Sequence, residues 1–221
     1  GWFIETEDEV FDPTRATLFD FRVPQKGDMR FMYLLPESTR SSLVEYTLFS
    51  SRLLPEQEYQ DELHKYVKTH LGTEKFTITE YEDGIIPMTD QPFPRRVGRR
   101  VLNIGTKGGR VKASTGFAFH RTLKDSRAIV QSLERHGHPF DIPKSGFFYG
   151  PMDRTLLSVL DLHGDQAADV FTRMFRDNPI HSLLRFLDEE ASVGEILKLM
   201  LTMPRAMFTR AFFRSAIAGR M

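Results

Sequence analysis

Three short runs of aromatic and aliphatic residues near the start of the chain constrain its fold most strongly. They span residues 17–23, 30–36 and 43–50, and short polar connections separate them. Runs of this length and composition are typical of β-strands. Short connections join antiparallel neighbours, because a parallel crossover needs about a dozen or more residues. The sequence therefore predicts an antiparallel sheet in the first part of the chain.

Two further elements are expected before residue 90. A helix should follow Pro55 and end near Gly72, because glycine readily takes the left-handed conformation that closes a helix. The inner face of this helix would carry Leu63, Tyr66 and Val67. Residues 75–81 alternate in the manner of another strand, and a turn then leads into an extended segment at 85–88.

A strand, a glycine-rich stretch and a helix are expected to follow one another in the middle of the chain. The strand would span residues 100–104 and run into the glycine segment, defined here as residues 105–116. Ser114 or Thr115 would cap the helix, which should reach about Arg135.

From Asp153, a candidate N-cap, the pattern is helical to the end of the chain. Residues 192–195 match a capping box, and Pro204 is suited to open the last helix. A boundary is expected near Pro151. The fold class predicted from these elements is α+β, with an antiparallel sheet followed by helices.

Composition excludes several classes of protein and of site. The chain has no cysteine, so disulfides, thiolate metal ligands and a cysteine nucleophile are ruled out. Basic and acidic residues number 30 each, which argues against a general nucleic-acid surface. No apolar run approaches the roughly 20 residues that span a bilayer. No His-Glu-x-x-His motif occurs, and no metal site is expected. The first residue is glycine, so we expect the chain to begin within a longer protein.

Glu45 is a lone carboxylate in the otherwise apolar run 43–50. With a period of two, it shares one face of the strand with Leu43, Thr47 and Phe49. If this face is buried, desolvation would raise the pKa of Glu45 and keep it protonated, as a general acid requires. The alternative is an edge strand with Glu45 in solvent.

The glycine segment is a second candidate site. Glycines let the backbone approach a flat or anionic ligand, and the following helix would offer free amide donors. The segment is neither a G-x-G-x-x-G fingerprint nor a phosphate loop. A plain connecting loop is the alternative.

Basic residues gather in two zones without any acid. Residues 95–112 hold seven of them, namely Arg95, Arg96, Arg99, Arg100, Lys107, Arg110 and Lys112. Residues 204–221 hold four arginines, on a helix that is only moderately amphipathic. The two zones suggest local anion contacts. The last helix would lie on an anionic membrane surface, or else pack its apolar side on the protein.

In order along the chain, short motifs up to about Leu133 resemble the lycopene cyclase family, flavoproteins that close the ends of linear carotenoids into rings. The motifs are residues 1–6, 11–13, 16–22, 31–36, 43–47, 84–88 and the glycine segment ending in Ser114-Thr115-Gly116-Phe117. The resemblance implies a fold similar to that of the aromatic-hydroxylase flavoproteins. Residues 1–98 would be the substrate-binding sheet region, 99–150 a remnant of the FAD-binding domain, and 151–221 a helical region.

The resemblance also implies roles for individual residues. Glu45 takes the place of the catalytic carboxylate of the family, while the family's second acidic position is Tyr46 here. The residues expected at the flavin are Gly105, Thr106, Gly108, Gly109, Ser114, Thr115 and Gly116. The residues expected at the substrate are Tyr33, Thr47, Phe49, Pro87, Met88 and Phe117.

The activity implied by the resemblance is a non-redox cyclisation of lycopene by a full-length parent enzyme. Reduced FAD would be required but not consumed, with NAD(P)H serving as reductant, and this fragment alone would be inactive. The expected location is the cytoplasm, with peripheral membrane contact through the last helix. The competing functions are a flavin monooxygenase of the aromatic-hydroxylase type and a non-catalytic carotenoid- or lipid-binding module.

Overall fold

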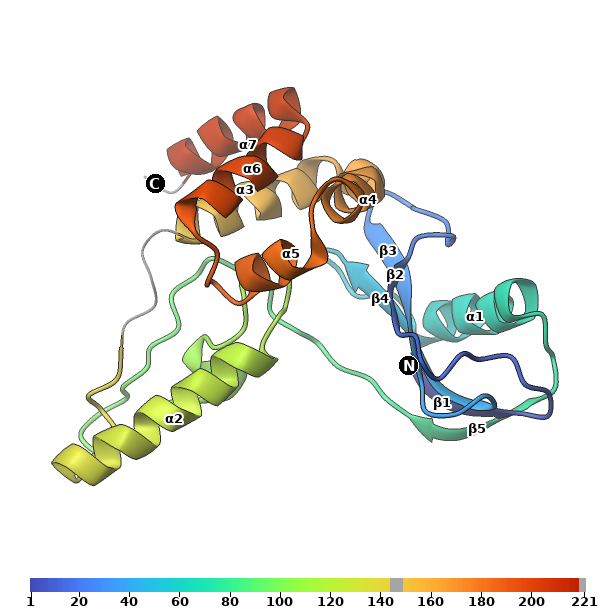
Figure 1. The fold of residues 1–221 in the computed structure, drawn as a ribbon, viewed down its shortest axis with the longest axis horizontal. Helices are drawn as coiled ribbons and strands as arrows, with labels where there is room; N and C mark the ends of the chain where they lie inside the picture. The colour runs from blue at the N-terminus through green and yellow to red at the C-terminus, as the bar shows by residue number, and fades with distance from the viewer. Residues whose placement is uncertain (144–148, 219–221) are drawn as a thin grey trace. The chain divides into compact units, whose positions relative to one another are not determined.

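A computed structural model describes residues 1–143 and 149–218, and it is a mixed α+β structure (Figure 1). The chain divides into two compact units, residues 1–85 with 160–168, and residues 86–159 with 169–218. The first unit holds the sheet, the helix between the last two strands along the chain, and a short helical stretch at 160–168, and the second is largely helical. The predicted α+β class, with an antiparallel sheet and helices, is thereby confirmed. The division into substrate-binding, FAD-binding and helical regions at residues 98 and 150 stays a prediction.

The first unit is built on a five-stranded antiparallel sheet with the strand order β2-β3-β4-β1-β5. The strands are β1 (Trp2–Thr6), β2 (Thr17–Asp20), β3 (Met29–Pro36), β4 (Ser41–Phe49) and β5 (Phe76–Tyr81). Four of the five follow the sequence prediction, although β2 ends earlier than expected. The first strand was not expected. It is an interior strand that lies between β4 and β5 and pairs with both.

One face of this sheet is covered by α1 (Glu56–Tyr66), which continues as a turn of π-helix from Val67 to Leu71. Gly72, at φ +74°, closes the helix in the left-handed conformation, as predicted. The predicted inner face is confirmed, since Leu63, Tyr66 and Val67 are buried. They pack against sheet residues Trp2, Ile4, Met32, Val44 and Tyr46.

A hydrogen-bonded carboxylate secures α1 to the sheet edge. The Tyr66 hydroxyl donates to Asp20 at 2.5 Å, and Arg22 donates to the same carboxyl from its backbone N–H and its guanidinium. Burial raises the pKa of Asp20, but the hydrogen bonds from Arg22 and Tyr66 together outweigh it and bring the value to about 2. Asp20 is therefore ionised throughout the neutral range and holds both partners in place.

In the second unit, residues 86–118 are mostly irregular. Residues 85–88, which follow the predicted turn, have no regular secondary structure. The predicted strand at 100–104 is wrong, since only an isolated bridge between Arg96 and Leu102 forms there. The segment folds back on residues 95–97 through this bridge and two flanking hydrogen bonds, which is too short a pairing to form a strand.

The long helix of this unit, α2 (Phe119–His136), begins later than predicted. Residues 113–115 form a turn, so neither Ser114 nor Thr115 caps it, and Ala118 occupies the N-cap position. Its apolar residues at helical spacing are largely exposed, with Phe119 at 72% and Val130 at 52%. The helix ends at Gly137, at φ +69°.

The remaining helices are α3 (Tyr149–Leu162), α4 (Ala167–Asp177), α5 (Ile180–Leu187), α6 (Val193–Thr202) and α7 (Arg205–Ala218). The capping box of α6 is confirmed, because Ser192 and Glu195 exchange the expected hydrogen bonds. Pro204 directly precedes α7. Asp153 is not an N-cap, since it lies inside α3, and its buried carboxylate instead binds Ser114 and Lys112.

Candidate functional site

Glu45 lies on β4, on the sheet face opposite to the one that α1 covers. Its neighbours Val44 and Tyr46 are buried in the core beneath α1, and alternation therefore turns Glu45 to the other side. The side chain is half-buried. The Thr47 hydroxyl donates a 2.9 Å hydrogen bond to Glu45 Oε1. The simple alternative, an edge strand, is excluded because β4 has β3 on one side and β1 on the other.

Three of the residues expected at the substrate share this face with Glu45. Tyr33 lies directly opposite Glu45 on β3, while Thr47 and Phe49 follow along β4. Burial, and to a lesser extent the negative charge of Glu45, raise the pKa of Tyr33 to about 12. The Tyr33 hydroxyl therefore stays neutral over the physiological range and keeps its proton.

An aromatic cluster that the sequence analysis missed surrounds these residues. Phe31, fully buried on β3, is its centre, with the ring centroids of Phe19, Tyr33 and Phe49 at 4.9, 5.0 and 5.5 Å. The signal was present in the sequence, since Phe31 lies two residues from Tyr33 and so shares its face. The face around Glu45 is thus apolar and rich in π-electron density.

Tyr46, which the resemblance would place at a second acidic position, belongs to the other face. Its ring is buried under α1, and its hydroxyl accepts a hydrogen bond from Arg30 Nη1 at 3.3 Å. Adjacent residues of a strand point to opposite faces, so a carboxylate at position 46 would not join Glu45. Glu45 is the carboxylate that this strand contributes to the aromatic face.

The glycine segment folds as a short 3₁₀ turn, Gly105–Gly108, followed by tight turns before α2. Gly105, Gly109 and Gly116 have φ values of +53°, +68° and +73°, which favour glycine. At Gly108 a β-carbon would lie 2.4 Å from the Asn103 carbonyl oxygen, so this glycine allows the chain to pack on itself. Within the described part of the chain, no atom lies within 4 Å of a β-carbon built at Gly105.

A buried ionic network anchors this segment, and sequence reasoning did not anticipate it. Lys112 is fully buried, with its Nζ 2.8 Å from Asp153 Oδ1 and 3.6 Å from Glu189 Oε1. Ser114, expected at the flavin, instead donates a 2.6 Å hydrogen bond to Asp153. The rings of Tyr149 and Phe186 flank the ammonium at 5.1 and 5.3 Å.

Three consecutive acids after α5 connect the same region to α2. Asp188 pairs with His120, Glu189 with Arg121 and Glu190 with Lys124, at 3.0, 2.6 and 2.5 Å respectively. Glu189 has φ +59°, which is unusual for a residue with a side chain. This conformation is maintained by Arg121 and Lys112, which both contact its carboxylate.

The remaining predicted substrate residues lie in the second unit. Pro87 and Met88 are half-buried in an irregular segment, and the preceding residue, Ile86, lies 3.3 Å from a β-carbon built at Gly116. The carbonyl of Phe117 accepts a hydrogen bond from the Lys112 backbone N–H. The structure therefore brings the Ile-Pro-Met segment beside the glycine segment at Gly116.

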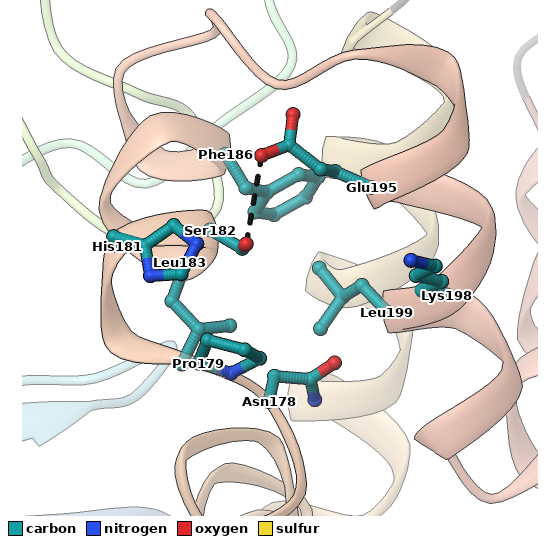
Figure 2. Close-up of a pocket in the computed structure, with 9 residues that line it drawn as sticks. All are labelled: Asn178, Pro179, His181, Ser182, Leu183, Phe186, Glu195, Lys198 and Leu199. Atoms are coloured by element: carbon teal, nitrogen blue, oxygen red, sulfur yellow. Dashed lines mark hydrogen bonds between the residues drawn. The ribbon is translucent and has the colours of Figure 1, made fainter.

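A cavity of about 290 Å³ lies between α5 and α6 (Figure 2). It is lined by Asn178, Pro179, His181, Ser182, Leu183, Phe186, Glu195, Lys198 and Leu199. Two of its polar groups are engaged at helix ends. Glu195 belongs to the capping box, and the Asn178 amide donates to the Met174 carbonyl and the Thr202 hydroxyl. None of the residues predicted for the site lines this cavity.

Comparisons with known proteins agree with the resemblance. The chain is 28% identical over 149 residues to lycopene beta cyclase, chloroplastic/chromoplastic, from Narcissus pseudonarcissus, which covers 62% of this chain and 29% of the relative. It is 28% identical over 148 residues to lycopene beta cyclase, chloroplastic, from Arabidopsis thaliana, covering 62% and 29%. The chain thus spans less than a third of the length of these relatives. No solved structure matches.

The family model described as lycopene cyclase protein matches residues 1–216. This match covers nearly the whole chain, including the strand that carries Glu45, the glycine segment and the helices that follow. The chain belongs to the lycopene cyclase family.

Proposed function

We propose that this chain is part of a lycopene cyclase that closes the ends of a linear carotenoid into rings. The observation that carries the proposal is the lone Glu45 carboxyl on an apolar, aromatic sheet face. A hydrocarbon end group has no polar handle, so its cyclisation must begin with proton delivery to an alkene. A carboxyl group beside aromatic rings is suited to that step.

The reaction is an isomerisation, in which no atoms are gained or lost. The protonated carboxyl of Glu45 donates H⁺ to a terminal double bond, and a carbocation forms at the adjacent carbon. The π-electrons of a second double bond attack this cation and close the ring. A neighbouring carbon then loses a proton to a base, which forms the ring double bond.

The residues around Glu45 would support both the carbocation and the proton transfers of this reaction. The faces of the Tyr33 and Phe49 rings, which Phe31 supports from within, stabilise a carbocation through cation–π interaction, worth about 2 kcal/mol or more when desolvated. The Thr47 hydroxyl donates to the carboxylate that remains after proton transfer. A hydroxyl can rotate to accept a hydrogen bond from Glu45 when the carboxyl is protonated, so it fits both states.

The glycine segment fits a flavin at some of the predicted positions. Thr115 Oγ1 is buried and has no hydrogen-bond partner among the described residues. The first turn of α2 has neither an acidic residue nor a side-chain cap, so its backbone N–H groups suit an electron-rich ligand. Gly105, Thr106, Thr115 and Gly116 would hold the ring system, while Gly108, Gly109 and Ser114 support the segment from within. When bound in its reduced form, FAD would supply electron density that stabilises positive charge.

The proposal is tested in the full-length protein by measuring NADPH consumed per ring formed from lycopene. A cyclase forms many rings for each NADPH and does so under anaerobic conditions, because the reductant only prepares the flavin. Consumption of one NADPH per product molecule, with a requirement for oxygen, would instead identify a monooxygenase of the aromatic-hydroxylase type. The absence of any lycopene turnover with flavin bound would favour a carotenoid-binding module.

Peripheral membrane contact through α7 remains part of the proposal. No helix within residues 1–143 and 149–218 is long and apolar enough to cross a bilayer. In α7, Ala211 is buried and Met207 and Phe208 are half-buried, whereas Phe212 and Phe213 are 48% and 62% exposed. Exposed phenylalanines beside arginines suit a lipid–water interface. The cytoplasmic location stays a prediction, and the relatives are named chloroplastic.

Replacing both exposed phenylalanines, Phe212→Ser and Phe213→Ser, should lower binding to anionic vesicles at least about tenfold. The reason is that two buried aromatic side chains contribute several kcal/mol to insertion. Vesicle flotation measures the effect. The matched control is Val130→Ser with Leu133→Ser, an equally exposed apolar pair on α2. Equal binding by both double variants and the parent would show that α7 makes no membrane contact.

A further inference from the structure

Residues 95–103 form a hairpin-like turn, called here the arginine turn. Arg96 and Leu102 make an antiparallel bridge, and the Val97 N–H donates to the Val101 carbonyl at 2.9 Å. Outside this pair, the Asn103 N–H donates to the Arg95 carbonyl at 2.7 Å. Gly98, at φ +79°, allows the chain to reverse. The turn is therefore a defined structure, and it places Arg99 and Arg100 next to its tip.

A cavity of about 490 Å³ lies between the arginine turn and the end of α2. Its lining consists of Arg96, Arg99, Arg100, Gly137, His138, Pro139 and Phe140. Gly137, which closes α2, thus also places residues 138–140 opposite the three arginines. The size falls within the range of about 300–1,000 Å³ that is usual for small-molecule sites.

The guanidinium of Arg96 is held in a fixed orientation. Its Nε donates to the Gly98 carbonyl and its Nη2 to the Arg99 carbonyl, both at 3.1 Å. Its carbon atom Cζ lies 3.9 Å from the centre of the Phe140 ring. Because an arginine has five N–H donors, most of them remain for a ligand. Because the side chain is already oriented, less conformational entropy is lost when a ligand binds.

The charge of this site is uncompensated. Among the described residues, Arg96, Arg99 and Arg100 form no ion pair with a carboxylate, whereas the nearby Arg95 and Arg110 both contact Asp125. The acid next in sequence to the cavity, Asp141, pairs with His136 at 3.0 Å. In a chain with equal numbers of acids and bases, three adjacent arginines without a carboxylate form a local anion site.

We propose that the arginine turn binds the phosphate or diphosphate group of a small molecule. Arginine forks match phosphate oxygens with paired hydrogen bonds, and an oriented guanidinium backed by an aromatic ring favours such an anion over water. His138 supplies a further donor. The group could belong to a soluble nucleotide or to a lipid headgroup, and the shared chemistry is the phosphate. This inference is independent of the proposed cyclisation.

The test is isothermal titration of the chain with sodium pyrophosphate, comparing the parent with Arg99→Gln/Arg100→Gln. The double variant should bind at least tenfold more weakly, and binding by the parent should weaken as salt rises. The matched control is Arg52→Gln/Arg127→Gln, which removes the same charge at two exposed positions and should bind like the parent. Equal weakening in both double variants, or no binding by the parent, would overturn the proposal.

Two further arms identify the source of the phosphate. One titrates NADPH, and the other measures flotation with phosphatidic acid vesicles against phosphatidylcholine vesicles. Loss of NADPH binding specific to Arg99 and Arg100 identifies a nucleotide, and loss of phosphatidic acid binding identifies a headgroup. If neither ligand responds to these substitutions, even though pyrophosphate binds, the site does not serve an organic phosphate and the proposal fails.

Discussion

Replacing Glu45 by glutamine in the full-length protein should reduce ring formation from lycopene at least about a hundredfold, because a positioned general acid contributes roughly 10²–10⁴ to a rate. Glutamine keeps the shape of the side chain and an oxygen for the Thr47 hydroxyl, but it cannot donate a proton of comparable acidity. The flavin content should be unchanged. The measurements are the rate of cyclic carotenoid formation and the flavin absorbance of the purified variant.

The matched control for this variant is Glu5→Gln. Glu5 lies on β1 and, by strand alternation, on the same sheet face as Glu45, but it is exposed. Its substitution changes the net charge of that face equally and should leave the rate within about twofold of the parent. A Glu45→Gln enzyme that retains more than a tenth of the parent rate would remove Glu45 from the role of acid. In that case, the aromatic face would still describe a carotenoid-binding surface.

Replacing Lys112 by methionine should lower the free energy of unfolding of the second unit by about 3–5 kcal/mol. The substitution leaves Asp153 buried without its cation, whereas Glu189 keeps Arg121, and removing one partner of a buried ion pair has a cost of this size. Urea denaturation can follow the two units separately. Far-UV circular dichroism reports mostly on the helices of the second unit, while the single tryptophan, Trp2, reports on the core of the first.

The Lys112→Met effect should therefore appear in the dichroism and leave the Trp2 fluorescence transition almost unchanged. The control is Lys107→Met, at an exposed lysine of the same segment, which should shift the unfolding free energy by less than about 0.5 kcal/mol. A second change, Asp153→Asn, should restore part of the stability of Lys112→Met by removing the negative charge that has lost its cation. Equal effects at Lys112 and Lys107 would mean that the network contributes nothing.

The sheet and α1 could be predicted because their signals are local. Short apolar runs with turn residues between them specify β2, β3 and β4, and the spacing from Leu63 to Val67 with Gly72 specifies the helix and its end. The first strand, β1, has no such signal. Its partners are β4 and β5, far along the chain, and five residues cannot indicate by themselves which strands they will join.

The segments predicted wrongly depend on tertiary contacts. Residues 100–104 have strand composition, but a strand forms only beside another, and here the segment turns back on residues 95–97. Ser114 has the side chain of a helix cap but donates to Asp153, a residue of a distant helix. For the same reason Asp153 is not an N-cap. Capping rules describe hydrogen bonds between a side chain and the nearby backbone. A buried partner far along the sequence can take the side chain away from that role.

The candidate site likewise has one part that local sequence patterns predict and one part that depends on tertiary contacts. The face shared by Glu45, Thr47 and Phe49 follows from alternation along one strand, and Tyr33 joins them through the pairing of β3 with β4. Lys112 and Glu189 could not be paired from the sequence, because a lysine in a glycine-rich stretch ordinarily suggests solvent or an anion. The roles of the predicted site residues in binding flavin or substrate remain predictions.

The position of β1 has a consequence for how the acid acquires its surroundings. Glu45 has one neighbour strand that arrives through a tight turn, and another, β1, that comes from the start of the chain and leaves its first glycine against the Glu45 side chain. Tight hairpins close early, whereas distant segments incur a larger entropic cost before they gain contacts. The β2-β3-β4 meander can therefore form first, and the later docking of β1 places Gly1 against the Glu45 side chain. The step that completes the sheet thus also completes the surroundings of the acid.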